Sequence, residues 1–271
     1  MSTEMQPSEW TENPVKHLED IEFSVASANG NRLSKAHMLR VSAVGKTFEK
    51  VDFRYSVFDD CYFRKCKFIN CDFTGAQLKN SSFRSSEFVG CKFDYVRFNN
   101  TRITNTILDN NQPGFENVAL EFAQSLRVNF GQIGDVVGVN KAIKHELMAT
   151  KTHLKKGAFS SEGWYRDKYT SWERAKFVWN YLTFSTLDFI WGNGESLFKI
   201  FRTICLVIFA STLFSIVSGE ALINSLQASV VVFLGLDTDA LPSKLGIPLV
   251  FCRFVLLGMF VSVLVKRLSR R

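Results

Sequence analysis

A five-residue step runs through the first half of this 271-residue chain and constrains its fold more than any other feature. Neither a helix, with 3.6 residues per turn, nor a strand, with a period of two, repeats every five residues. The position two residues before each centre is small or β-branched in all repeats but the first. A fixed short period of this kind predicts a stacked coil. The thirteen consecutive apolar centres are Phe48, Phe53, Phe58, Phe63, Phe68, Phe73, Leu78, Phe83, Phe88, Phe93, Phe98, Ile103 and Leu108.

The order of a small residue, a polar residue and a Phe or Leu centre resembles the pentapeptide-repeat family. The resemblance implies a right-handed, four-sided β-helix over residues 46–110, with residues 1–45 as an N-terminal cap or tail. Residues twenty apart would stack at one strand spacing of ~4.8 Å. Cys71 and Cys91 are then expected to be small buried hydrophobic side chains, and a disulfide between them is the alternative.

The charge of the coil bears on its partners. Residues 46–110 hold eleven basic and eight acidic side chains, a net charge of +3. Mimicry of DNA, a known role of the family, needs an acidic rod, so we expect no nucleic-acid function. The expected role is that of a rigid scaffold, a sensor arm or a docking surface for a cytoplasmic protein partner.

Catalysis is not expected. Asp135, His145 and Glu146 are the candidates for an acid/base or metal set, but a lone histidine on a charged helix is more often solvated. The six cysteines follow no metal-ligand spacing. We therefore expect no enzyme activity, no metal site and no cofactor.

The middle of the chain switches to helical spacing. Residues 113–160 are predicted to form a helical linker of two helices, with Asp135 as the N-cap of the second. Ten aromatic residues interspersed with basic ones follow between positions 164 and 191. Trp, Tyr and basic residues favour the membrane interface, so residues 164–195 are predicted to lie along the inner leaflet. An aromatic soluble core is the alternative.

Three apolar runs end the chain, at residues 203–219, 221–236 and 245–265. A membrane span needs about 20 residues, which makes the middle run marginal. Basic residues flank the first run on its N-terminal side and the last run on its C-terminal side, in "KRLSRR". The positive-inside rule then places both termini in the cytoplasm. We predict transmembrane helices at 196–218 and 245–267 and a re-entrant segment at 221–242.

Three stretches carry a second resemblance. "GNGESLFKIFR" is similar to the segment that precedes the pore where pentapeptide repeats are fused to channels, and "VNFGQIGD" resembles their linker. "SLQASVVVFLGLDTDALP" looks like the pore loop of two-transmembrane potassium channels. The resemblance implies a multidomain β + α membrane protein of the bacterial inner membrane, a homotetramer that passes inorganic cations through a two-helix pore domain.

The filter departs from that family. Its Thr-x-Gly-Tyr-Gly pattern aligns with residues 234–238, where the Thr and both Gly are replaced. We therefore expect a weakly selective cation pathway rather than a potassium filter, with carboxylate rings at its outer mouth. The alternatives are a non-conducting membrane-anchored scaffold and a triggered membrane-depolarising pore of toxin or defence type. The predicted filter and pore-loop residues are Gly235, Leu236, Asp237, Thr238 and Asp239.

Further residues in the last span are candidates for electrostatic and gating roles. Arg253 lies inside the membrane segment, where arginine is costly and faces protein or water. We expect it to pair with Glu220, Asp237 or Asp239, and the alternative is that it lines the pore. Gly258 is a candidate hinge, with close helix packing as its alternative. Phe260 and Leu264 are candidates for a hydrophobic gate, and the alternative is that these two side chains face lipid.

Overall fold

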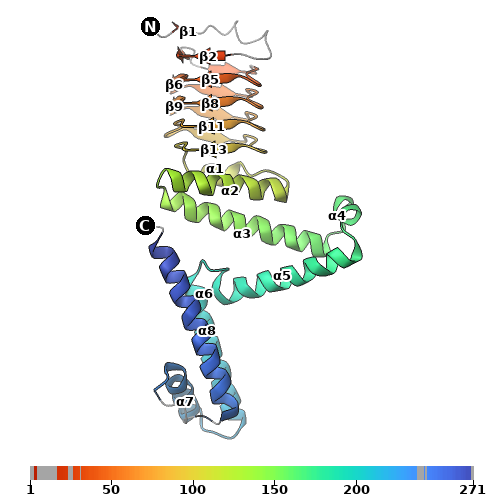
Figure 1. Cartoon of the computed structure of the whole chain (residues 1–271), viewed down its shortest axis with the longest axis vertical. Helices are drawn as coiled ribbons and strands as arrows, with labels where there is room; N and C mark the ends of the chain where they lie inside the picture. The colour runs from red at the N-terminus through yellow and green to blue at the C-terminus, as the bar shows by residue number, and fades with distance from the viewer. Residues whose placement is uncertain are drawn as a thin grey trace. The chain divides into compact units, whose positions relative to one another are not determined.

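The computed structural model describes residues 3–4, 17–23, 27–30, 32–236, 241 and 243–269. The chain forms two compact units, Met1–Gly157 and Ala158–Arg271. The first unit is a stack of short strands closed by helices, and the described residues of the second unit form helices joined by turns, without strands (Figure 1).

Parallel strands of two or three residues build the coil of the first unit. Phe48, Phe68 and Phe88 are neighbours in one sheet, so the register is twenty residues per turn, as predicted. Three faces are continuous sheets, and isolated bridges between Asp52, Asp72 and their neighbours form the fourth. The strands are β1 (Thr3–Glu4), β2 (His17–Glu19), β3 (Ile21–Glu22), β4 (Ser27–Asn29), β5 (His37–Leu39), β6 (Ser42–Val44), β7 (Thr47–Glu49), β8 (Val57–Asp59), β9 (Tyr62–Arg64), β10 (Lys67–Ile69), β11 (Gln77–Lys79), β12 (Glu87–Val89) and β13 (Arg97–Asn99).

Phenylalanine rings fill the axis of the coil. The rings of Phe68 and Phe48 stack with centroids 4.9 Å apart, and Phe68 and Phe88 repeat that distance. The ladder of Phe53, Phe73 and Phe93 has spacings of 4.9 and 5.0 Å. These spacings match the distance between neighbouring strands. The predicted ladders are therefore confirmed.

The coil begins earlier than the predicted boundary at residue 46. Strands β5 and β2 lie twenty and forty residues before β8 and continue its sheet. The repeat is hard to recognise before residue 46 because only one of the earlier centres is phenylalanine. The buried centres before residue 46 are Leu18, Phe23, Ala28, Leu33, Met38 and Ala43.

Each corner of the coil requires a left-handed residue. Positive φ recurs at every multiple of five from position 30 to position 100, in each case two residues after a centre. Gly, Asn and Asp tolerate this conformation best, and they occupy many of these corners, such as Gly75, Asn80 and Gly90. At Gly75, a Cβ would lie 2.5 Å from the Tyr55 ring, so this corner also needs the space.

The small residues before the centres are hydrogen-bond donors as well as spacers. The Cys61 and Cys71 thiols donate to the carbonyls of Met38 and Phe48, both at 3.3 Å. Thr101 makes the equivalent bond to Leu78 at 3.0 Å. Each of these groups satisfies a carbonyl of a centre 23 residues earlier. All six cysteines are free thiols, Cys71 and Cys91 included.

Burial predicts the chemistry of the coil thiols. It raises the pKa of Cys61 to about 11, so only about one thiol in a thousand is ionised at pH 8. We expect iodoacetamide at pH 8 to leave Cys61 unmodified in the native protein and to modify it after denaturation, as read by mass spectrometry. Because the folded pKa exceeds the ordinary value of 9.0, this thiol also contributes stability below pH 9.0 that is lost as the pH rises toward about 11. Rapid alkylation of native Cys61 would contradict this burial.

A short helix and a helical hairpin close the end of the coil (Figure 1). They are α1 (Ile107–Asn110), α2 (Glu116–Gln132) and α3 (Val136–Phe159). The last centre, Leu108, is buried in α1 rather than in a strand. The Phe122 ring of α2 stacks on Phe93 at 5.7 Å. The predicted N-cap is confirmed, since Asp135 accepts from the backbone N–H of Gly138 at 2.9 Å.

Polar side chains of α2 satisfy the open edge of the last turn. Ser125 Oγ accepts from the N–H of Phe98 at 3.0 Å, and Asn129 bonds both backbone groups of Thr101, at 2.7 and 2.8 Å. An unpaired strand edge is a template for aggregation. Helix α2 removes that hazard, because its side chains make hydrogen bonds to the last turn that a further strand would otherwise make.

The second unit holds five helices in its described residues. They are α4 (Gly163–Lys168), α5 (Ser171–Trp191), α6 (Leu197–Val217), α7 (Leu222–Leu234) and α8 (Ser243–Leu268). Helices α6 and α8 run side by side, with α7 packed against both at the end away from the C-terminus (Figure 1).

Candidate functional site

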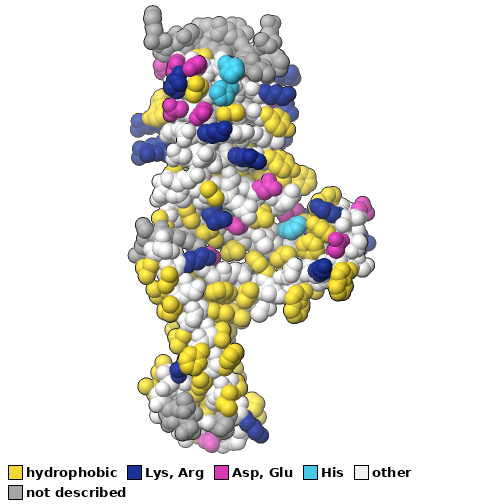
Figure 2. Space-filling model, in the orientation of Figure 1, with side chains coloured by type: hydrophobic (Ala, Val, Ile, Leu, Met, Phe, Trp, Pro, Cys, Tyr) yellow, Lys and Arg dark blue, Asp and Glu magenta, His cyan; other side chains and the backbone are white. Residues whose placement is uncertain are grey.

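Helices α6 and α8 are apolar and mostly unburied. The helical stretches Leu197–Val217 and Lys244–Leu268 are long and apolar enough to cross a membrane, and the 18-residue windows inside them have mean hydropathies of 2.2 and 2.3. Only 22% and 17% of them are buried inside this chain, whereas the core helix of a soluble protein would be mostly buried. Figure 2 shows apolar side chains along this part of the molecule. The most exposed ones are Phe198, Phe201, Phe209, Phe214, Val217, Ile247, Phe251, Phe254, Val261, Val265 and Leu268.

Small hydroxyl residues occupy the buried faces of α6 and α7. Thr212 donates to the Ile208 carbonyl within its own helix at 2.9 Å, which satisfies its hydroxyl internally. Small residues of this type let membrane helices approach closely. The buried hydroxyl residues are Thr203, Ser211, Thr212, Ser215, Ser225 and Ser229.

Arg253 lies against the carboxyl end of α7. Gly235 caps this helix in the left-handed conformation, at φ 75°. A Cβ at Gly235 would collide with the Arg253 guanidinium, so the arginine occupies the space that glycine leaves. The guanidinium carbon also lies 4.7 Å from the Phe254 ring centroid. Since a helix ends in partial negative charge, Arg253 is placed at the end of α7 that attracts it.

Among the described residues, Arg253 forms no ion pair with Glu220, and its Nε is buried without a hydrogen-bond partner. Its pairing with Asp237 or Asp239 remains a prediction, since both lie outside the described residues. Glu220 is exposed and its backbone N–H bonds to Ser215. Of the predicted filter loop, Gly235 caps α7 and Leu236 is 75% exposed; Asp237, Thr238 and Asp239 lie outside the described residues.

The hinge and gate candidates lie on an unbroken stretch of α8. Gly258 is exposed, and a Cβ added there would have no neighbouring atom of this chain within 4 Å apart from the backbone of its own helix. Phe260 and Leu264 are half-buried, one helical turn apart. Their gating roles remain predictions.

The "GNGE" stretch connects the N-terminal end of α6 to the C-terminal end of α8. Gly192 terminates α5 in the left-handed conformation. Glu195 then forms an ion pair with Lys266, and its carbonyl accepts from Arg267 at 3.2 Å. At the same end, Lys199 pairs with Asp188 at 2.6 Å. The motif is visible in the sequence but this role is not, because the partners of Glu195 lie 71 and 72 residues away.

Reversing the charge at this contact tests its role. We expect Glu195→Lys to repel Lys266 and to increase backbone hydrogen exchange in the last turn of α8 about two- to fivefold, as befits a partly exposed ion pair. Adding Lys266→Glu should restore the wild-type rate, measured by mass spectrometry on peptides covering residues 260–268. A double variant that exchanges as fast as Glu195→Lys alone would mean that the pair is not coupled.

Helix α5 exposes a stripe of aromatic and aliphatic side chains. Trp172, Trp179, Leu182 and Phe189 are all more than half exposed, and no residue of this helix is buried. Thr170 and Glu173 form a capping box at its start. The stripe fits the predicted interfacial segment, because it presents apolar area with Trp rings along one face.

The acid/base candidates are not brought together. Asp135 caps α3, Glu146 pairs with Arg127 at 2.9 Å, and His145 bonds to Gln112. Each side chain has a structural partner of its own.

Comparison with known proteins identifies the coil. The pentapeptide-repeat family matches residues 48–84 and 71–110, in eight copies. This part of the chain is therefore a pentapeptide-repeat β-solenoid. The crystal structure of a pentapeptide repeat protein from the thylakoid lumen of Arabidopsis thaliana is similar, with 18% identity, 34% of this chain and 72% of that chain covered, and a TM-score of 0.17. No curated protein matches the sequence.

Proposed function

We propose that the protein is an oligomeric, channel-like membrane protein whose pentapeptide-repeat coil is a cytoplasmic scaffold. The observation that carries the proposal is the apolar surface that α6, α7 and α8 leave uncovered in a single copy. Lipid would cover part of this surface, and sibling copies would cover the rest. A homotetramer in the bacterial inner membrane is proposed by resemblance to two-transmembrane pores.

The length of α7 supports a re-entrant path. Its 13 residues extend for only about 20 Å, against about 30 Å of hydrocarbon. A helix of this length enters the membrane without crossing it, so α6 and α8 remain the two spans. Both termini would then lie on the cytoplasmic side, as the basic flanks favour.

Charge counting favours cations over anions. Each copy would bring Asp237 and Asp239 to the outer mouth and one Arg253 to the end of α7. Two carboxylates against one guanidinium leave a net charge of −1 per copy. Rings of carboxylates attract cations, so the proposed pathway passes cations with weak selectivity.

The main alternative is a membrane-anchored scaffold that conducts nothing. The position of Arg253 favours it, because the guanidinium cancels the partial negative charge that α7 would otherwise offer an ion. A pore that opens only when triggered is a third function, and toxicity on overexpression would favour it.

Ion flux through liposomes that contain the purified full-length protein tests the proposal. We expect a reversal potential that favours cations over chloride. We also expect Asp237→Asn with Asp239→Asn to weaken that preference, and Arg253→Gln to strengthen it. Absence of flux would favour the anchored scaffold, and an anion preference in the wild type would refute the cation pathway.

A further inference from the structure

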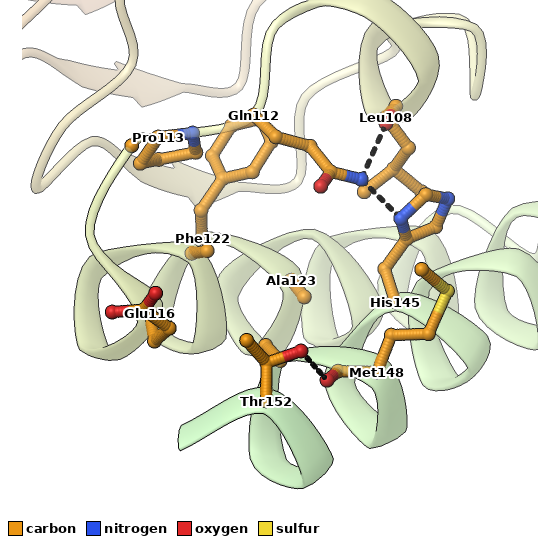
Figure 3. A pocket seen from close by; sticks show the side chains of 12 residues that line it. Leu108, Gln112, Pro113, Glu116, Phe122, Ala123, His145, Met148 and Thr152 are labelled. Atoms are coloured by element: carbon orange, nitrogen blue, oxygen red, sulfur yellow. Dashed lines mark hydrogen bonds between the residues drawn. The ribbon is translucent and has the colours of Figure 1, made fainter. Parts of the chain in front are cut away.

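A small cavity of about 160 Å³ lies between the last turn of the coil and the α2–α3 hairpin (Figure 3). Most of its lining is apolar, contributed by Leu108, Phe122, Ala123 and Met148 among others. The polar groups of Gln112 and His145 meet at its edge. The proposed membrane function uses none of these residues.

The hydrogen bonds fix how the Gln112 amide is turned. Its Nε2 lies 3.0 Å from the carbonyl oxygen of Leu108, and a carbonyl only accepts, so the amide nitrogen faces that oxygen. The same nitrogen is bonded to Nδ1 of His145. That ring nitrogen must therefore accept, which makes His145 neutral with its proton on Nε2. Burial lowers the pKa of His145, which favours the same neutral form.

This arrangement leaves the Gln112 oxygen free. Figure 3 shows Oε1 on the side of the amide that faces away from His145. Within the described part of the chain, no donor bonds to that oxygen. The carboxylate in the lining, Glu116, is compensated by Lys156 at 2.6 Å. The cavity thus offers apolar walls, an open acceptor at Gln112 Oε1 and, at Glu116, a carboxylate that is paired with a lysine.

Volume limits what can bind. A cavity of about 150 Å³ holds a benzene ring, and drug-sized ligands need about 300 Å³ or more. We propose that this cavity binds a neutral, one-ring compound whose single hydroxyl or N–H donates to Gln112 Oε1. Its ring packs against Phe122 and Met148, since thioether and aromatic groups attract each other.

Methyl NMR of the full-length protein in detergent micelles, labelled with ¹³C at its methionine methyls, tests this site directly. The probes are 4-fluorophenol and fluorobenzene, which differ only in the donor. We expect a saturable shift of the Met148 methyl with 4-fluorophenol and none at Met38, which is buried in the coil. Fluorobenzene should bind about three- to tenfold more weakly, the effect of one neutral hydrogen bond.

Two substitutions with matched controls separate cavity filling from hydrogen bonding. Ala149→Leu fills the cavity and should abolish the shift, whereas Thr150→Leu adds bulk to α3 outside the lining and should not. Gln112→Met should equalise the two probes, whereas Gln124→Met should preserve their difference. Equal affinities in the wild type, a shift that never saturates, or binding retained in Ala149→Leu would overturn the proposal. Should Ala149→Leu not fold, the Gln112→Met comparison decides.

Discussion

Replacing Phe68 by alanine is expected to destabilise the coil by about 3–5 kcal/mol, the usual cost of deleting a fully buried ring. The Phe68 ring stacks on the rings of Phe48 and Phe88. Its centroid also lies 5.7 Å from the centroid of the Phe73 ring. Because the axis is closed on all four sides by backbone, the coil cannot collapse into the gap. A loss of this size approaches the whole stability of an ordinary domain, about 5–15 kcal/mol.

Hydrogen exchange on coil peptides measures this loss inside the full-length protein. Residues 57–79 should exchange more than about a hundredfold faster in Phe68→Ala, as a 3 kcal/mol loss requires. Tyr62→Ala is the matched control, since it removes a ring that is 41% exposed on the same coil. We expect its effect to stay within about 1 kcal/mol. Equal effects of the two substitutions would contradict a close-packed axis.

Gly235→Ala is expected to have the largest effect in the second unit. Alanine in the left-handed conformation costs about 1–2 kcal/mol, and the added Cβ would displace the Arg253 guanidinium from the end of α7. That energy alone corresponds to about a 5- to 30-fold change in the population of the native arrangement. We therefore expect flux in liposomes to fall at least about fivefold, with a lower thermal midpoint.

Gly258→Ala is the matched control for this substitution. Gly258 lies in a helix with open space around it in this chain, and alanine is the better helix former. Its thermal midpoint should be unchanged or higher. If Gly235→Ala leaves the thermal midpoint as high as Gly258→Ala does, the contact between Arg253 and α7 does not support the site.

The sequence predicts the coil well where its centres are phenylalanine. The step of five is set by the geometry of one side of a turn, so it is visible without any tertiary information. The step is harder to recognise before residue 46, because the buried centres there include Leu18, Ala28 and Ala43. These residues differ less from their neighbours in the sequence than phenylalanine does. A second signal extends further, namely the Gly, Asn and Asp residues at the left-handed corners, such as Asp20 and Gly30.

The candidate site is less predictable, because its contacts join residues without a shared period. Arg253 stands out as a charge in an apolar run, but nothing in the sequence indicates that Gly235 leaves space for it. The pairing of Glu195 with Lys266 spans 71 residues. Gln112 and His145 likewise meet only because α2 and α3 fold back on the coil.

Imaging single particles in lipid nanodiscs tests the central claim most directly, namely that α6 and α8 cross the membrane and α7 returns to the face it entered among sibling copies. We predict a closed ring of four copies with the α7 carboxyl ends turned toward the symmetry axis. In such a particle, Ser269 and the coil would lie on the same side of the bilayer. A particle without a central axis, or one with Ser269 across the bilayer from the coil, would contradict the account.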